Sequence, residues 1–100
     1  MKRVYIIWWA EEFACKIGIS EAPRSRLHEG ARAWNPYLTL DYFSPLIPDA
    51  WAVEKQIHAH LKKAGRHWYG EWFKISKEEA RELVEGLAGI KFTGFKEMVG

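Results

Sequence analysis

Residues 3–20, with the sequence RVYIIWWAEEFACKIGIS, decide the fold of this chain. The segment 3–9 is rich in β-branched and aromatic residues and is too short for a typical helix, so it predicts a strand. Residues 15–20 predict a second strand, and the polar link over 10–13 predicts an antiparallel hairpin. An isolated glycine inside a strand, here Gly18, is typical of a place where another backbone or a ligand comes close.

The rest of the chain predicts helices and strands in alternation. They are a helix that begins at Pro23 and ends before Pro36, a strand over 37–43, a helix over 50–63 capped by Asp49, a short strand over 71–75, and a helix with Ser76 and Glu79 as its capping box that ends near Gly89. From Ile90 onward we expect either a last short strand or a packed extension. This order predicts a small α+β fold in which helices flank a mainly antiparallel sheet.

The length and composition limit the class of protein. A chain of 100 residues predicts a single domain over 1–100 and excludes a multidomain enzyme. The only cysteine, Cys15, excludes an internal disulfide and a zinc site built on cysteine pairs, and it fits a reducing compartment. No apolar stretch approaches the roughly 18 residues of a membrane span. We therefore expect a cytoplasmic protein that does not associate with membranes.

Basic residues gather in one part of a chain whose net charge is only +2. Between positions 55 and 74 five Lys and Arg residues stand against Glu71 alone. Such a run on a helix is either a solvated face or a surface for a polyanion. The candidates for contacts with nucleic acid in this run are Lys55, Lys62, Lys63 and Arg66.

Six tryptophans are a high number for this length. Tryptophan rings serve as stacking platforms for bases in some proteins, but more often they fill a small core. We expect the core role for Trp8, Trp51 and Trp72. The sequence holds no phosphate-binding loop, dinucleotide fingerprint, zinc-protease motif or nucleophile-elbow serine.

Four short motifs resemble those of the GIY-YIG nuclease superfamily. Residues 4–6 (VYI) and 16–18 (KIG) are similar to its two strand motifs, in the variant whose second motif reads K-I-G. Arg26 comes ten residues after Lys16, at the place of the family's helix arginine. Residues 53–58 (VEKQIH) and 70–73 (GEWF) resemble the A-E-x-x-x-H and G-E-W-F signatures of a phage-associated and stand-alone branch.

The resemblance implies a metal-dependent endonuclease that hydrolyses phosphodiester bonds in duplex or branched DNA. Glu54 would hold Mg²⁺ or Mn²⁺, and Tyr5 would orient or deprotonate the attacking water. Lys16 would lower the Tyr5 pKa or bind phosphate, and Arg26 would clamp phosphate. His58, one turn from Glu54, would assist proton transfer or orient the carboxylate.

This sequence departs from the family pattern at two motif positions. Val4 replaces the first glycine of the family motif, and Lys16 replaces a tyrosine. A late asparagine of some members has no clear counterpart, and Arg66 or Glu71 falls in that region.

Two alternatives belong to other functional classes. One is a nucleic-acid-binding module that cleaves slowly or not at all, because Lys16 has displaced a catalytic phenol. The other is a protein-interaction domain with an aromatic surface. A nuclease requires Tyr5, Lys16, Arg26 and Glu54 to line one concave face, because metal, water and phosphate must meet within a few ångströms.

Overall fold

The computed structural model describes residues 1–31 and 34–94, without the side chains of 29–31 and 93–94. At its centre β1 (Arg3–Trp9) and β2 (Ala14–Ser20) form an antiparallel hairpin over their whole length. A 3₁₀ turn over Ala10–Glu12 joins the two strands. The hairpin that the sequence predicts is therefore confirmed, with β2 one residue longer than expected.

A six-stranded antiparallel sheet grows outward from this hairpin within the described residues, in the order β4-β5-β2-β1-β3-β6. The outer strands are β3 (Thr39–Phe43), β4 (His67–Tyr69), β5 (Trp72–Phe73) and β6 (Thr93–Gly94). The strand predicted over 71–75 is present but shorter, as β5. The chain turns at Gly70, whose φ of +54° suits glycine, so that β4, which the sequence did not predict, pairs with β5.

The first helical segment follows β2 after a short turn. It begins as α1 (Pro23–Ser25) and continues as a π-helix over Arg26–Ala31. The buried Pro23 occupies the first helical position, where its missing N–H costs nothing. The remainder of the helix predicted up to Pro36 includes positions 32 and 33, which lie outside the described residues.

Two longer helices complete the fold, α3 (Ala50–Lys63) and α4 (Lys77–Ala88). The Ser76 hydroxyl accepts a hydrogen bond from the Glu79 backbone N–H at 3.1 Å, and Gly89, with φ of +66°, ends α4. Asp49 lies at the N-cap of α3, but its side chain makes no capping bond. The prediction of a capping side chain there was wrong, because only the Asp49 backbone carbonyl accepts a bond, from Val53 N–H.

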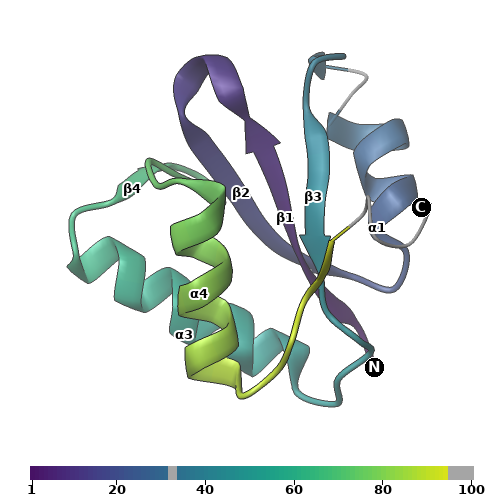
Figure 1. Ribbon diagram of the computed structural model, residues 1–100, viewed down its shortest axis with the longest axis vertical. Helices are drawn as coiled ribbons and strands as arrows, with labels where there is room; N and C mark the ends of the chain where they lie inside the picture. Colours follow the sequence, from purple (N-terminus) through teal and green to yellow (C-terminus); the bar gives the residue numbers. More distant parts are fainter. Residues whose placement is uncertain (32–33, 95–100) are drawn as a thin grey trace.

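The two faces of the sheet bury separate cores. Figure 1 shows α3 and α4 side by side, with α1 next to β3 on the other side of the sheet. Buried residues of the first core include Val4, Ile6, Ile57 and Val84. Buried residues of the second core include Tyr5, Ile7, Leu27 and Leu38. The alternation along β1 thus sends successive side chains to opposite cores.

The predicted core tryptophans have different outcomes. Trp72 is 7% exposed and belongs to the second core, and Trp8 packs half-buried against the first. Trp51 is 63% exposed, so the expectation of a core position was wrong for it. It lies on the outer side of α3, where the Lys55 ammonium is 4.3 Å from its ring centroid. Within the described chain no helix is long and apolar enough to cross a membrane.

Candidate active site

The site begins with a cross-strand pair at the centre of the sheet. Tyr5 on β1 lies opposite Gly18 on β2, and directly opposed residues in an antiparallel pair share a face. A Cβ atom on residue 18 would lie 2.5 Å from Tyr5 Oη and 2.7 Å from Cζ. The close approach predicted at Gly18 therefore comes from a tyrosine ring, neither from backbone nor from a ligand.

The Tyr5 hydroxyl is buried and makes no hydrogen bond within the described chain. Burial raises the pKa of Tyr5, and the negative charges of Glu71 and Glu54 raise it further. The Arg26 guanidinium lies close enough to lower this pKa in part, although the two groups do not meet hydrogen-bond geometry. Arg26, rather than Lys16, is the cation that acts on Tyr5. The phenol is consequently neutral at pH 7 and offers a free donor.

The turn after β2 brings Arg26 to this phenol. The Ser20 hydroxyl accepts a hydrogen bond from the Ala22 backbone N–H at 3.0 Å, and the helix begins at the next residue, Pro23. The Arg26 backbone N–H bonds the Ala22 carbonyl at 3.1 Å and opens the π-helical turn. Single π turns occur frequently at functional sites, because they redirect one side chain.

Glu54 and His58 reach the site around an open edge of β2. Strand β5 pairs with β2 only at Cys15 and Lys16, and at Ile17 the backbone N–H donates to the Glu71 carbonyl while the carbonyl faces α3. His58 Nε2 donates a hydrogen bond to the Ile17 carbonyl at 2.7 Å, which requires a proton on Nε2 because a carbonyl only accepts. His58 thereby fixes α3 against the edge of β2 and positions Glu54 one turn earlier.

Glu54 has a second carboxylate beside it. Burial raises the pKa of Glu54 most, and the negative charge of Glu71 raises it further. His58, Lys2 and the Ile19 backbone amide oppose this shift. A nearby cation would offset the negative charge of Glu71 that disfavours ionisation of Glu54.

Glu71 is the residue that the sequence analysis left without a role. The turn at Gly70 brings the backbone carbonyl of Glu71 to β2, where the Ile17 N–H donates a hydrogen bond to it at 3.1 Å. Its carboxylate Oε2 lies 3.8 Å from Lys16 Nζ. Glu71 thus contacts Lys16 and acts electrostatically on both Tyr5 and Glu54. The signal in the sequence was its place directly after Gly70, inside the GEWF segment.

The predicted residues therefore divide into two groups. In the first, Lys16 contacts Glu71 and His58 contacts β2. The charges of Arg26, Glu54 and Glu71 act on Tyr5, although α3, which carries Glu54, packs on the opposite face of the sheet from Tyr5. We call Tyr5, Lys16, Arg26, Glu54 and Glu71 the charged cluster.

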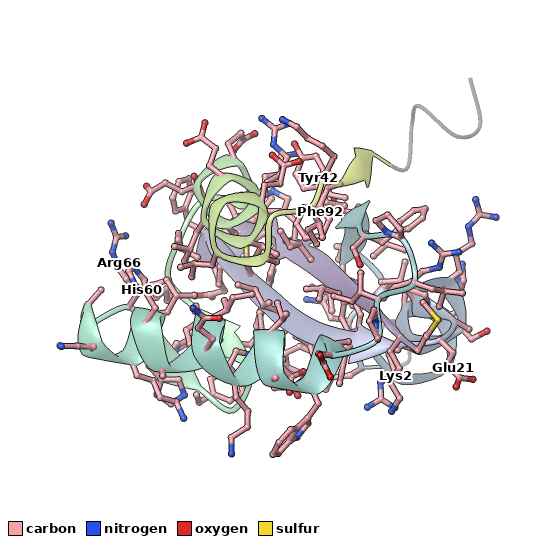
Figure 2. The ribbon with its side chains drawn as sticks, turned by 90° about the horizontal axis from the view of Figure 1, so that it is seen from below. Lys2, Glu21, Tyr42, His60, Arg66 and Phe92 are labelled. Atoms are coloured by element: carbon pink, nitrogen blue, oxygen red, sulfur yellow. The ribbon has the colours of Figure 1, made fainter. Side chains whose placement is uncertain are left out.

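The four predicted nucleic-acid contacts do not join the charged cluster. Lys55 covers Trp51, while Lys62 and Lys63 are exposed in the last turn of α3. Arg66 donates to the Lys74 carbonyl and pairs with Glu79 at 3.4 Å. In Figure 2, Arg66 and His60 lie at the C-terminal end of α3, away from Lys2 and Glu21.

The donor set suits a hard cation of the Mg²⁺ type. Within residues 1–31 and 34–94, no group of three or more His, Cys, Asp or Glu side chains could hold a metal ion. Glu54 and Glu71 provide two hard oxygen donors next to an unpaired phenol, and Mg²⁺ is commonly bound by one or two carboxylates with waters and substrate phosphate. The residues present therefore fit Mg²⁺ or Mn²⁺ and exclude a closed zinc site of four protein ligands among the described positions.

The fold and this cluster define a small α+β domain in which a phenol, two cations and two carboxylates meet at one edge of a central hairpin. The family model named T5orf172 domain matches residues 2–88. The chain belongs to the T5orf172 domain family, and the match includes the whole charged cluster. Comparison with curated proteins and with solved structures gave no match.

Proposed function

We propose that this protein is a metal-dependent DNA endonuclease of the GIY-YIG type that acts inside the cell. The observation that carries the proposal is that Arg26 of the π-helical turn and Glu54 of α3 lie near enough to Tyr5 of β1 for their charges to act on its buried, unpaired hydroxyl. The four motifs that resemble the GIY-YIG superfamily contain four of the five residues of the charged cluster. The fifth, Arg26, follows Lys16 at the family's spacing.

The cluster contains the parts that phosphodiester hydrolysis needs. Mg²⁺ or Mn²⁺ held by Glu54 and Glu71 would supply neutralisation of the phosphate charge. Arg26 is suited to a bidentate contact with the phosphate, whose negative charge grows in the transition state. Lys16, paired only loosely with Glu71, is available for a second phosphate oxygen.

Tyr5 has the role of orienting water. Its neutral hydroxyl can hold the attacking water by a hydrogen bond, because no described residue occupies it. The oxygen of that water attacks phosphorus as the bond to the leaving oxygen breaks. The proton that the water loses passes to solvent, because the carboxylates of Glu54 and Glu71 would hold the metal and the Tyr5 phenol already carries its proton.

The test is a cleavage assay on supercoiled plasmid and on a single-stranded oligonucleotide with Mg²⁺ or Mn²⁺, repeated in EDTA. We expect nicks with metal and none in EDTA, and the folded Glu54→Gln protein, purified in the same way, should be less active by on the order of a hundredfold. Full activity in Glu54→Gln would indicate a contaminating nuclease and overturn the proposal. Wild-type protein that binds DNA but never nicks would favour the alternative of a binding module.

A further inference from the structure

Four tryptophans meet on the face of the sheet that carries Tyr5. Trp9 is at their centre, with ring centroids 5.0 Å from Trp34, 5.5 Å from Trp68 and 5.5 Å from Trp72. Trp34 and Trp72 also lie 6.4 Å apart. We call Trp9, Trp34, Trp68 and Trp72 the tryptophan cluster. The proposed chemistry uses none of them.

Core packing does not account for the outer part of this cluster. Trp72 is 7% exposed, but Trp34 is 58% exposed and the adjoining Tyr69 is 44% exposed. Leu27, Leu38 and other buried residues already fill the second core beneath. The ring planes of Trp34 and Trp9 are 86° apart, so Trp9 does not stack flat on Trp34. Trp34 therefore has ring surface available for a flat ligand, while buried neighbours hold it in place.

The tryptophan cluster is contiguous with the charged cluster. Trp72 lies directly opposite Lys16 in the pairing of β5 with β2. Trp9 follows Tyr5 by four residues on the same face of β1, a distance of about 13 Å at the rise of a strand. Since stacked nucleotides advance about 3.4 Å along one strand, this distance is about four nucleotides. One bound strand can therefore reach both clusters.

The charge beside the rings is that expected for a nucleic acid strand. Lys74 Nζ is 3.9 Å from the Trp68 ring centroid, and Lys16 lies opposite Trp72. Lys74 Nζ also donates to the Glu12 backbone carbonyl at 2.7 Å and pairs with the Glu12 carboxylate at 3.3 Å. An ammonium group has three donors, so one remains for a phosphate oxygen. Proteins that bind single strands combine such cations with aromatic rings on which bases stack. An apolar peptide would not require the cations.

We propose that the tryptophan cluster stacks unpaired nucleobases beside the scissile phosphate, so that the substrate is single-stranded or locally unpaired DNA. The cleavage half of this inference rests on the proposed function, but base stacking does not. Bases paired inside a duplex present only their edges in the grooves, so a flat face of Trp34 selects for unpaired bases. Trp34 is then a residue that determines specificity.

The test measures binding of a short oligothymidylate and of a duplex of equal length in EDTA, where cleavage is absent. Trp34→Ala should weaken single-strand binding by about tenfold or more, because stacking contributes about 1–3 kcal/mol per base. Duplex binding should change less than twofold, and Trp34→Phe should retain most single-strand affinity. Trp51→Ala is the matched control, since Trp51 is as exposed, at 63%, but lies on α3 across the sheet.

Equal single-strand affinity of Trp34→Ala and Trp51→Ala would overturn the inference, and so would wild-type preference for the duplex. Trp34 is largely exposed, so its replacement should leave folding intact, as thermal unfolding can verify. The two proposals fail separately. Cleavage of plain duplex with Mg²⁺ but no effect of Trp34 would remove only this inference. Trp34-dependent binding without nicking in Mg²⁺ would remove only the nuclease.

Discussion

The Tyr5 ring lies on Gly18, its cross-strand neighbour, and a single Cβ at position 18 would overlap the phenol. Gly18 of the KIG motif is thus needed for the position of the Tyr5 ring on the neighbouring strand β1. An aromatic ring that covers a strand glycine also shields the backbone there. The relationship explains why the two strand motifs occur together, since each supplies half of one packed pair.

Gly18→Ala should displace the Tyr5 hydroxyl and lower nicking at least tenfold. The overpacking should also lower the free energy of unfolding by about 1–3 kcal/mol. Denaturant unfolding and the nicking assay, run on the same preparation, measure the two effects. Gly86→Ala on α4 is the control, because a Cβ there meets nothing within 4 Å. We expect it to be fully active and up to about 1 kcal/mol more stable. Normal activity of a folded Gly18→Ala would contradict the assigned role of Tyr5.

Glu71→Gln should reduce nicking on the order of a hundredfold, as should Glu54→Gln, because each removes a charged metal ligand but keeps the volume. Metal binding gives an independent readout. Mg²⁺ or Mn²⁺ should raise the melting temperature of the wild type, since ligands that bind the folded state stabilise it, and should not raise that of either variant. Glu82→Gln, at an exposed position of α4, should behave as wild type. Unchanged metal stabilisation in Glu71→Gln would remove Glu71 from the site.

Tyr5→Phe should lower activity without lowering stability. The hydroxyl is buried and unpaired in the described structure, and an unsatisfied buried polar group costs about 1–3 kcal/mol. Its removal should leave the free energy of unfolding unchanged or raise it by about 1 kcal/mol, while nicking falls. The denaturant midpoints of wild type and Tyr5→Phe give the difference in free energy of unfolding, provided that both proteins unfold with the same slope m. A clearly destabilised Tyr5→Phe would mean that the hydroxyl has a structural partner.

Reversal of Lys62 and Lys63 to Glu tests whether the exposed end of α3 contacts DNA. If each lysine neutralises one phosphate, affinity should fall alike for all sequences, and the slope of log K against log salt should become shallower by about two. The nicking rate of bound DNA should not change, because both lysines lie outside the charged cluster. Unaltered binding would leave these residues as a solvated face. The control is Lys91→Glu, which reverses one exposed lysine after α4 and measures how far net charge alone changes DNA affinity.

Cys15 should resist thiol reagents in the folded protein. The thiol is buried, its Sγ donates to the Ile75 carbonyl at 3.4 Å, and burial raises its pKa far above the usual range. Above the pKa of an unfolded cysteine, about 8.5, the unfolded thiol loses its proton while the folded thiol keeps it. Stability should then fall by up to about 1.4 kcal/mol per pH unit between pH 9 and 10. Cys15→Ala should lack this component, and equal slopes for both proteins would contradict it.

Local sequence determined the elements whose signals lie within a few residues. The alternation in 3–9 and 15–20 specified the central hairpin, and Ser76 and Gly89 marked the two ends of α4. The helical spacing of Val53, Ile57, Leu61 and Ala64 predicts the inner face of α3. The first three residues occupy that face, but Ala64 is exposed at the C-cap. These predictions held because hydrophobic periodicity, capping and backbone preference act between near neighbours along the chain.

Only the tertiary structure decided how distant segments meet. Nothing near Trp51 or Trp34 along the chain distinguishes the exposed ring from the one that packs beside Trp9, because a tryptophan reads the same in either place. The role of Glu71 depends on where β5 stops pairing with β2, which a two-residue strand does not encode in its own periodicity. Burial, mutual charge and ring contacts arise from side chains far apart in sequence. They exist only after the sheet has brought those side chains together, and for that reason the charged cluster and the tryptophan cluster emerged from the fold.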